Sequence, residues 1–169
     1  MVRLIRRKGR RNQAEELKDL RIEYLPDNEA IISTLAKWHN GIWPHGSVEY
    51  RRMHLRSQVG SRGIPTTFVA MSGKTLLGSA SLVLQDLKAR PELSPWMATV
   101  FVVPKYRKQG TGSALVNRVV KEAARLKAEA LYLFTPDQEK FYSSLGWSLI
   151  ERIHHRNEEQ SIMRIYPKS

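Results

Sequence analysis

The fold of this chain is decided by the segment Val100-Phe-Val-Val-Pro-Lys-Tyr-Arg-Lys-Gln-Gly-Thr-Gly-Ser-Ala-Leu115. Its apolar start predicts a strand, which Pro104 ends because proline cannot donate to a strand's hydrogen-bond ladder. Gly110 and Gly112 permit backbone conformations and close approaches that a Cβ would block. A helix that begins at this turn points unpaired N–H groups outward, and its dipole adds partial positive charge. Strand, turn and helix together predict a site for an anion such as phosphate.

The residues of the turn narrow the kind of phosphate ligand. A P-loop spacing is absent, and Leu115 stands where a dinucleotide-binding fingerprint needs its third glycine. What remains is Arg107-x-x-Gly110-x-Gly112, with Lys108 adding a further charge. This pattern resembles the Arg/Gln-x-x-Gly-x-Gly/Ala motif of the GCN5-related N-acetyltransferase (GNAT) superfamily, whose turn amides hold the pyrophosphate of acetyl-coenzyme A. A basic turn that only caps a helix is the alternative.

A second motif lies downstream, at Phe141-Tyr-Ser-Ser-Leu-Gly-Trp147. It resembles the aromatic-Tyr-x-x-x-Gly-Phe/Trp signature of the same superfamily. There the tyrosine lies beside the thioester sulfur, where a phenol can protonate or stabilise the leaving thiolate. The resemblance therefore makes Tyr142 the candidate general acid. The alternative is that Tyr142 only packs its helix against the sheet.

The expected elements also follow the order of that superfamily. Hydrophobic periodicity and turn residues predict strands at 20–25, 66–71, 75–84, 96–103, 130–134, 147–153 and 160–166, and helices at 29–40, 48–57, 112–127 and 135–145. This order predicts an α/β (α+β) sandwich with a mixed sheet. The resemblance, which covers about residues 20–166, implies a mostly antiparallel sheet with a splay between strands four and five.

Two local signals refine these elements. Gly78, inside the second strand of a predicted hairpin, indicates a bulge or a close backbone approach. Thr135 is expected to cap the last helix, with Pro136 at its first position and Gln138 closing a capping box.

The composition suits one domain in a reducing compartment. The chain has 169 residues, no cysteine and a net charge of +12. Residues 20–169 are expected to form a single acetyltransferase domain, and residues 1–19 a basic, flexible tail; residues 1–12 alone carry six of the excess charges. The lack of cysteine excludes disulfides and a cysteine nucleophile, and it is compatible with a cytoplasmic location. No apolar run reaches the ~20 residues of a membrane span.

The resemblance implies coenzyme contacts on the fourth strand, the glycine turn and the end of the fifth strand. The expected residues are Val100, Phe101, Val102, Arg107, Lys108, Gln109, Gly110, Thr111, Gly112, Ser113 and Thr135. Thr135 departs from the superfamily, in which many members carry Asn at this place. Trp43, Arg90 and Trp96 lie on elements that usually shape the acceptor pocket, although each could equally serve packing.

The absence of cysteine favours direct attack of an amine on the thioester in a ternary complex. Asp86, Glu92, His45 and a water relay are the candidates for the base. No metal is expected, because His154 and His155 are adjacent on a predicted strand and point to opposite faces.

The sequence does not identify the acceptor, which could be a small amine, an antibiotic, a polyamine, a protein N-terminus or an aminoacyl group. The protein is expected to be a monomer or homodimer. Two other functions remain open. One is a coenzyme A-binding regulatory module without turnover, and the other is a basic protein that binds nucleic acid or the ribosome through residues 1–12.

Overall fold

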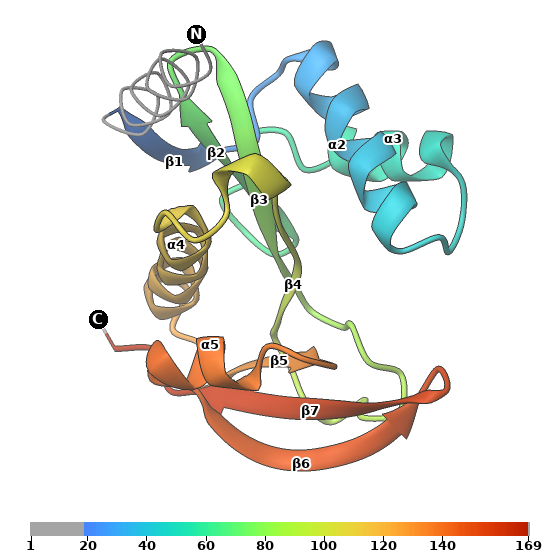
Figure 1. Ribbon diagram of the computed structural model, residues 1–169, viewed down its shortest axis with the longest axis vertical. Helices are drawn as coiled ribbons and strands as arrows, with labels where there is room; N and C mark the ends of the chain where they lie inside the picture. The colour runs from blue at the N-terminus through green and yellow to red at the C-terminus, as the bar shows by residue number, and fades with distance from the viewer. Residues whose placement is uncertain (1–18, 169) are drawn as a thin grey trace, which may run out of the picture.

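The computed structural model describes residues 19–168 as a seven-stranded sheet flanked by helices (Figure 1). The strands are β1 (Leu20–Tyr24), β2 (Thr66–Ser72), β3 (Thr75–Val83), β4 (Trp96–Val102), β5 (Leu131–Thr135), β6 (Ser148–His155) and β7 (Glu158–Ile165). Their order is β1-β2-β3-β4-β5-β7-β6, and only the β4–β5 pair is parallel. The helices are α2 (Glu29–Ile42), α3 (Val48–Arg56), α4 (Thr111–Arg125) and α5 (Glu139–Ser144), with a 3-10 turn, η1, at Pro104–Tyr106. The predicted fold class is confirmed.

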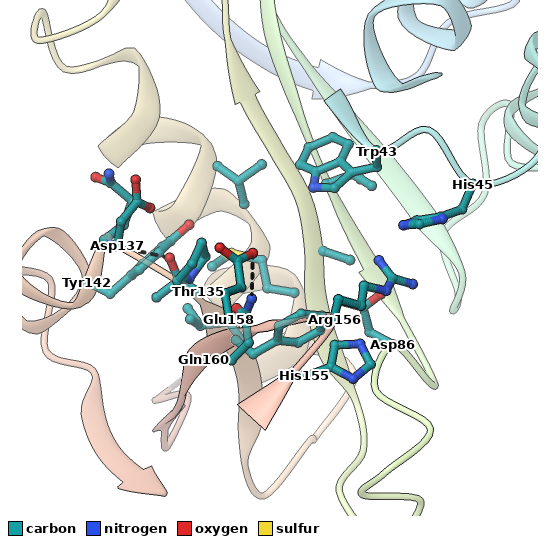
Figure 2. Close-up of a pocket in the computed structure, with 18 of the residues that line it drawn as sticks. Trp43, His45, Asp86, Thr135, Asp137, Tyr142, His155, Arg156, Glu158 and Gln160 are labelled. Carbon is teal, nitrogen blue, oxygen red and sulfur yellow. Dashed lines mark hydrogen bonds between the residues drawn. The ribbon is translucent and has the colours of Figure 1, made fainter. Parts of the chain in front are cut away.

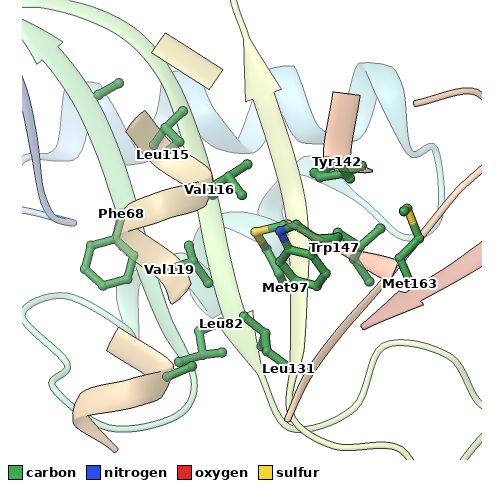
Figure 3. Close-up of a cluster of buried hydrophobic side chains, with 14 of the residues drawn as sticks. Phe68, Leu82, Met97, Leu115, Val116, Val119, Leu131, Tyr142, Trp147 and Met163 are labelled. Carbon is green, nitrogen blue, oxygen red and sulfur yellow. The ribbon is translucent and has the colours of Figure 1, made fainter. Parts of the chain in front are cut away.

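Both faces of the central strands are buried, because the strand residues alternate between two hydrophobic cores. On β2, Phe68 belongs to the core under α4, whereas Val69 belongs to the core under α2 and α3. Helix α4 contributes Leu115 and Val119 to the first core (Figure 3). That core continues across the sheet to Tyr142 and ties α5 to the rest of the fold.

Strands β4 and β5 separate soon after they meet. They pair only at Trp96↔Tyr132, and Figure 1 shows β5–β7 as a second wing of the sheet below β1–β3. An irregularity in β4 accompanies the separation: Ser81 of β3 faces Ala98, but Ser79 faces Phe101. One extra residue on β4 therefore forms a bulge, which bends the strand.

The bulge centres on Thr99, which has a φ of 49° and donates a hydrogen bond to Ser81 Oγ (2.8 Å). Further along, Gly78 of β3 lies against β4 so closely that a Cβ there would be 2.2 Å from Phe101 O. The predicted close approach at Gly78 is confirmed.

Helix α5 begins later than predicted. The sequence indicated a start at Thr135, but β5 continues through that residue and the helix begins at Glu139 after the cap residue Gln138. The Thr135 hydroxyl accepts a hydrogen bond from the backbone N–H of Gln138 (3.1 Å), so it closes a turn before the helix. The contact expected between Thr135 and Gln138 is therefore present, but the predicted helix start at Thr135 was wrong. Gly146, with a φ of +91°, follows the end of the helix as expected.

Residues 1–18 lie outside the described part of the chain, so the tail expected there stays a prediction. Within residues 19–168, no helix is long and apolar enough to cross a membrane.

Candidate active site

Two cavities open into the gap between β4 and β5. The first, which we call the turn cavity, has a volume of about 660 Å³ and lies between the end of β4, the glycine turn, the start of α4 and α5. The second, the sheet cavity, has a volume of about 460 Å³ and lies between β4, β5 and the β6–β7 hairpin. Both are lined by the same five residues, Trp43, Val100, Asp137, Gln138 and Tyr142. These residues mark the junction between the cavities.

The turn cavity offers the start of α4 to a ligand. Gly110 precedes the helix with a φ of +90°, and no side chain caps the helix. The first N–H groups of the helix therefore have no intrahelical partner. Arg107 donates from Nε to Val102 O (2.9 Å), which fixes its side chain beside the end of β4. Positive charge, a helix N-terminus and glycine backbone together fit a pyrophosphate.

Most of the predicted coenzyme-binding residues come together in the turn cavity. The predicted coenzyme-binding residues that line it are Val100, Phe101, Val102, Arg107, Lys108, Gly110, Gly112 and Ser113. The other three do not. Gln109 donates from Nε2 to Lys105 O (3.1 Å), Thr111 is buried at the start of α4, and Thr135 lines the sheet cavity.

Tyr142 combines a packed ring with a free hydroxyl. Its ring contacts those of Phe141 and Trp147 edge to face, and only 8% of the residue is exposed. Within residues 19–168 its hydroxyl has no hydrogen-bond partner, and Figure 2 shows that it points away from α5. Burial, with a smaller contribution from the charge of Asp137, raises the pKa of Tyr142 to about 12. The phenol is therefore protonated at neutral pH and can donate a hydrogen bond.

The sheet cavity carries different groups at its two ends (Figure 2). Asp137 and Tyr142 lie at one end, and Asp86 and Arg156 lie at the other. Between them, Gln160 Nε2 donates to the carboxylate of Glu158 (3.0 Å).

The three candidate bases differ in position. Asp86 lines the sheet cavity at the end away from Tyr142, and the protein around its carboxyl group raises its pKa to about 6, although Arg156 opposes this rise. His45 also lines the sheet cavity, whereas Glu92 is exposed and lines neither cavity. The carboxylate nearest the junction is Asp137.

The three residues predicted to shape the acceptor pocket also differ in position. Trp43 lines both cavities, and Arg51 holds its loop by donating to the backbone oxygens of Trp43 and His45. Arg90 lines neither cavity and is paired with Glu151 on β6.

Trp96 is fully buried in a core at the start of β4, where its Nε1 donates to Leu93 O (2.6 Å). Arg90 and Trp96 therefore lie outside both cavities and hold neighbouring elements together. On β6, His154 is exposed and His155 lines the sheet cavity, as their adjacent positions on a strand imply.

Sequence reasoning missed the polar residues that tertiary structure brings to the sheet cavity. These are Asp137, Gln138, Arg156, Glu158 and Gln160. Asp137 could have been noticed, because it precedes Tyr142 by little more than one helical turn. The others come from the β6–β7 hairpin, and no local pattern shows which of its faces meets β5.

Comparisons with known proteins identify the family and similar folds. A family model described as an acetyltransferase (GNAT) domain matches residues 64–149. Among solved structures, yncA from Salmonella typhimurium with acetyl-CoA has a TM-score of 0.70 at 15% identity, covering 89% of this chain and 95% of that chain. Spermidine N-acetyltransferase from Vibrio cholerae, in complex with CoA and spermine, has a TM-score of 0.66 at 18% identity over 89% and 96%. An aminoglycoside 6'-N-acetyltransferase complexed with coenzyme A has 0.70 at 16% over 88% and 98%. No curated protein sequence matches the chain.

Proposed function

Because this chain belongs to the GNAT acetyltransferase family, we propose that it transfers an acetyl group from acetyl-coenzyme A to a primary amine, directly and within a ternary complex. The observation that carries the proposal is the junction of the two cavities at Val100, Asp137 and Tyr142. A thioester held in the turn cavity and an amine held in the sheet cavity would meet there. The likeness to spermidine and aminoglycoside N-acetyltransferases supports an amine as acceptor.

The turn cavity has the groups that coenzyme A requires. Arg107, Lys108 and the N–H groups at the start of α4 would hold its phosphates. The segment of β4 from Val100 to Val102 is not paired with β5, so its backbone groups could pair with the amides of the pantetheine arm. When bound, acetyl-coenzyme A supplies an activated acyl carbon.

The chain's own residues would then direct the protons. As the nitrogen–carbon bond forms and the carbon–sulfur bond breaks, the Tyr142 hydroxyl would donate a hydrogen bond to the leaving sulfur. Its pKa of about 12 exceeds the ~8.5 of an ordinary thiol, so Tyr142 stabilises a thiolate more readily than it protonates one. A backbone N–H near Val102 would stabilise the negative charge on the thioester oxygen.

The amine must also lose a proton. We propose that Asp137 accepts it, directly or through water, because it is the carboxylate that lines both cavities. Asp86 lies at the other end of the sheet cavity and Glu92 lies outside both, so neither is favoured as the direct acceptor.

The test combines binding and turnover. We expect calorimetry to show binding of acetyl-coenzyme A in preference to ATP and NAD. Asp137→Asn should lower kcat by roughly 10²- to 10⁴-fold, Tyr142→Phe should lower it by roughly 10- to 100-fold, and acetyl-coenzyme A should still bind to both. Tyr50→Phe is the matched control, because Tyr50 is exposed on α3 and lines neither cavity.

Each contrary result has a definite meaning. A folded protein that does not bind acetyl-coenzyme A would overturn the proposal. Binding without turnover of any primary amine would favour a coenzyme A-binding regulatory module. Full activity of Tyr142→Phe would restrict Tyr142 to packing.

A further inference from the structure

The distribution of charge along the sheet cavity bears on the acceptor. The end at Tyr142 carries the carboxylate of Asp137, and Glu158 follows it along the cavity (Figure 2). The opposite end carries the guanidinium of Arg156, with the imidazoles of His45 and His155 around it. An extended acceptor would therefore meet negative charge at its reacting amine and, at its far end, the guanidinium of Arg156 with the Asp86 carboxylate beside it.

Arg156 differs from the other arginines near the site. Within residues 19–168 it makes no hydrogen bond and no ion pair, whereas Arg51 and Arg90 are held by partners of the protein. Asp86 lies close enough to interact electrostatically with Arg156, but it forms no hydrogen bond with it. The donors of the Arg156 guanidinium are therefore available to a ligand.

The backbone holds Arg156 in this position. Arg156 and Asn157 form the two-residue turn between β6 and β7, with φ angles of 54° and 65°. Positive φ at both central residues is typical of a type I′ turn, whose conformation is set by the pairing of the strands. The turn thus presents the exposed Arg156 side chain to the cavity from the end of the β6–β7 hairpin.

We propose that Arg156 binds a carboxylate at the far end of the acceptor, so that the acceptor is an amine with a distant carboxylate, such as an ω-amino acid or a short peptide. This inference rests on the proposed function. The planar guanidinium matches a carboxylate through two parallel hydrogen bonds. Asp86 beside Arg156 would repel a dianionic phosphate more strongly than a monoanionic carboxylate, and the second ammonium of a polyamine would meet the positive charge of Arg156.

Three amines of similar length differ in the group at the end away from the reacting amine: 5-aminopentanoate, pentylamine and 1,5-diaminopentane. We expect the wild-type kcat/KM to be highest for 5-aminopentanoate, by roughly 10- to 100-fold over pentylamine, the range expected for a charge-assisted hydrogen bond. The difference should appear mainly in KM, because the carboxylate lies away from the reacting atoms. The diamine should be the poorest of the three.

The variants at position 156 are chosen so that the new residue suits the positive φ of the turn. Asn and Asp tolerate positive φ, so Arg156→Asn and Arg156→Asp should keep the hairpin intact. Arg156→Asn should remove the preference for 5-aminopentanoate, and Arg156→Asp should shift the preference to the diamine. Arg156→Lys should retain part of the original preference. Arg152→Gln is the matched control, because Arg152 lies on β6, which leads into the turn, but outside both cavities, paired with Glu139.

Equal turnover of the three amines, or an unchanged preference in Arg156→Asp with normal thermal stability, would overturn the inference but leave the proposed function intact. Binding of acetyl-coenzyme A with no turnover of 5-aminopentanoate, while another amine is acetylated, would do the same. A failure to acetylate any primary amine would instead count against the proposed function itself.

Discussion

Gly78 shows how the site depends on one backbone contact. A Cβ at this position would lie 2.2 Å from Phe101 O and 3.1 Å from Val102 Cα, and both of these residues line the turn cavity. Neither contact can relax by a side-chain rotation, because both involve main-chain atoms. Strand β4 would have to move as a whole.

We therefore expect Gly78→Ala to lower the free energy of unfolding by about 1–3 kcal/mol, the usual cost of overpacking, and to weaken acetyl-coenzyme A binding. Urea denaturation and calorimetry measure the two effects. Gly41→Ala is the control, since Gly41 lies in α2 with nothing within 4 Å of an added Cβ. A Gly78→Ala variant as stable as the wild type would show that β3 and β4 are less closely fixed than described.

At the scale of the element, α4 is anchored by a buried carboxylate. Glu122, near its C-terminal end, is 1% exposed and accepts hydrogen bonds from Arg118 (2.9 Å), Arg125 (2.6 Å) and the Tyr24 hydroxyl on β1 (2.8 Å). Burial by itself raises the pKa of this carboxyl. The hydrogen bonds from Arg125, Arg118 and Tyr24 together outweigh burial and lower it to about 2.

The sign of the pH dependence follows from this lowered pKa. A carboxyl that titrates lower in the folded state stabilises the fold above its unfolded pKa of ~4.3, and this stability is lost as the pH falls toward 2. Glu122→Gln should therefore cost about 2–3 kcal/mol at pH 7 and much less near pH 2. Urea denaturation at several pH values measures this change.

Glu49→Gln is the matched control, because Glu49 forms an exposed pair with Arg52 and such pairs contribute ~1 kcal/mol or less. A loss of stability in Glu122→Gln that did not vary between pH 7 and pH 2 would point to altered packing rather than charge.

An element could be predicted from the sequence where a few neighbouring residues determine it, but not where strand pairing determines it. Gly110 and Gly112 mark the turn within a few residues, so most of the predicted coenzyme residues do line one cavity. The bulge at Thr99 gave no signal, because threonine is an ordinary strand residue and only the pairing with β3 reveals the extra position. Arg156 likewise reaches the sheet cavity only because β7 pairs with β5. The splay between β4 and β5 was expected from the superfamily resemblance alone.

At the scale of the whole molecule, the two wings of the sheet are joined across the gap that forms the site. Strands β4 and β5 pair only at Trp96↔Tyr132, and the core that contains Leu115, Met97 and Trp147 spans the two wings (Figure 3). The turn cavity is lined by β4 and α4 from one wing and by α5 from the other. A ligand in this cavity would contact both wings and oppose their separation.

We therefore expect acetyl-coenzyme A to raise the thermal midpoint of unfolding. At about 100 times its Kd, binding to the folded state adds about 2.7 kcal/mol, which corresponds to roughly 5–10 °C for a domain of this size. ATP should raise the midpoint much less, because it matches the anion site but cannot reach the junction at Tyr142. Gly112→Trp should remove the effect of acetyl-coenzyme A, since Gly112 lines the turn cavity at the start of α4. Equal stabilisation by ATP, or by acetyl-coenzyme A in Gly112→Trp, would mean that the +12 chain binds polyanions through its general charge rather than through this cavity.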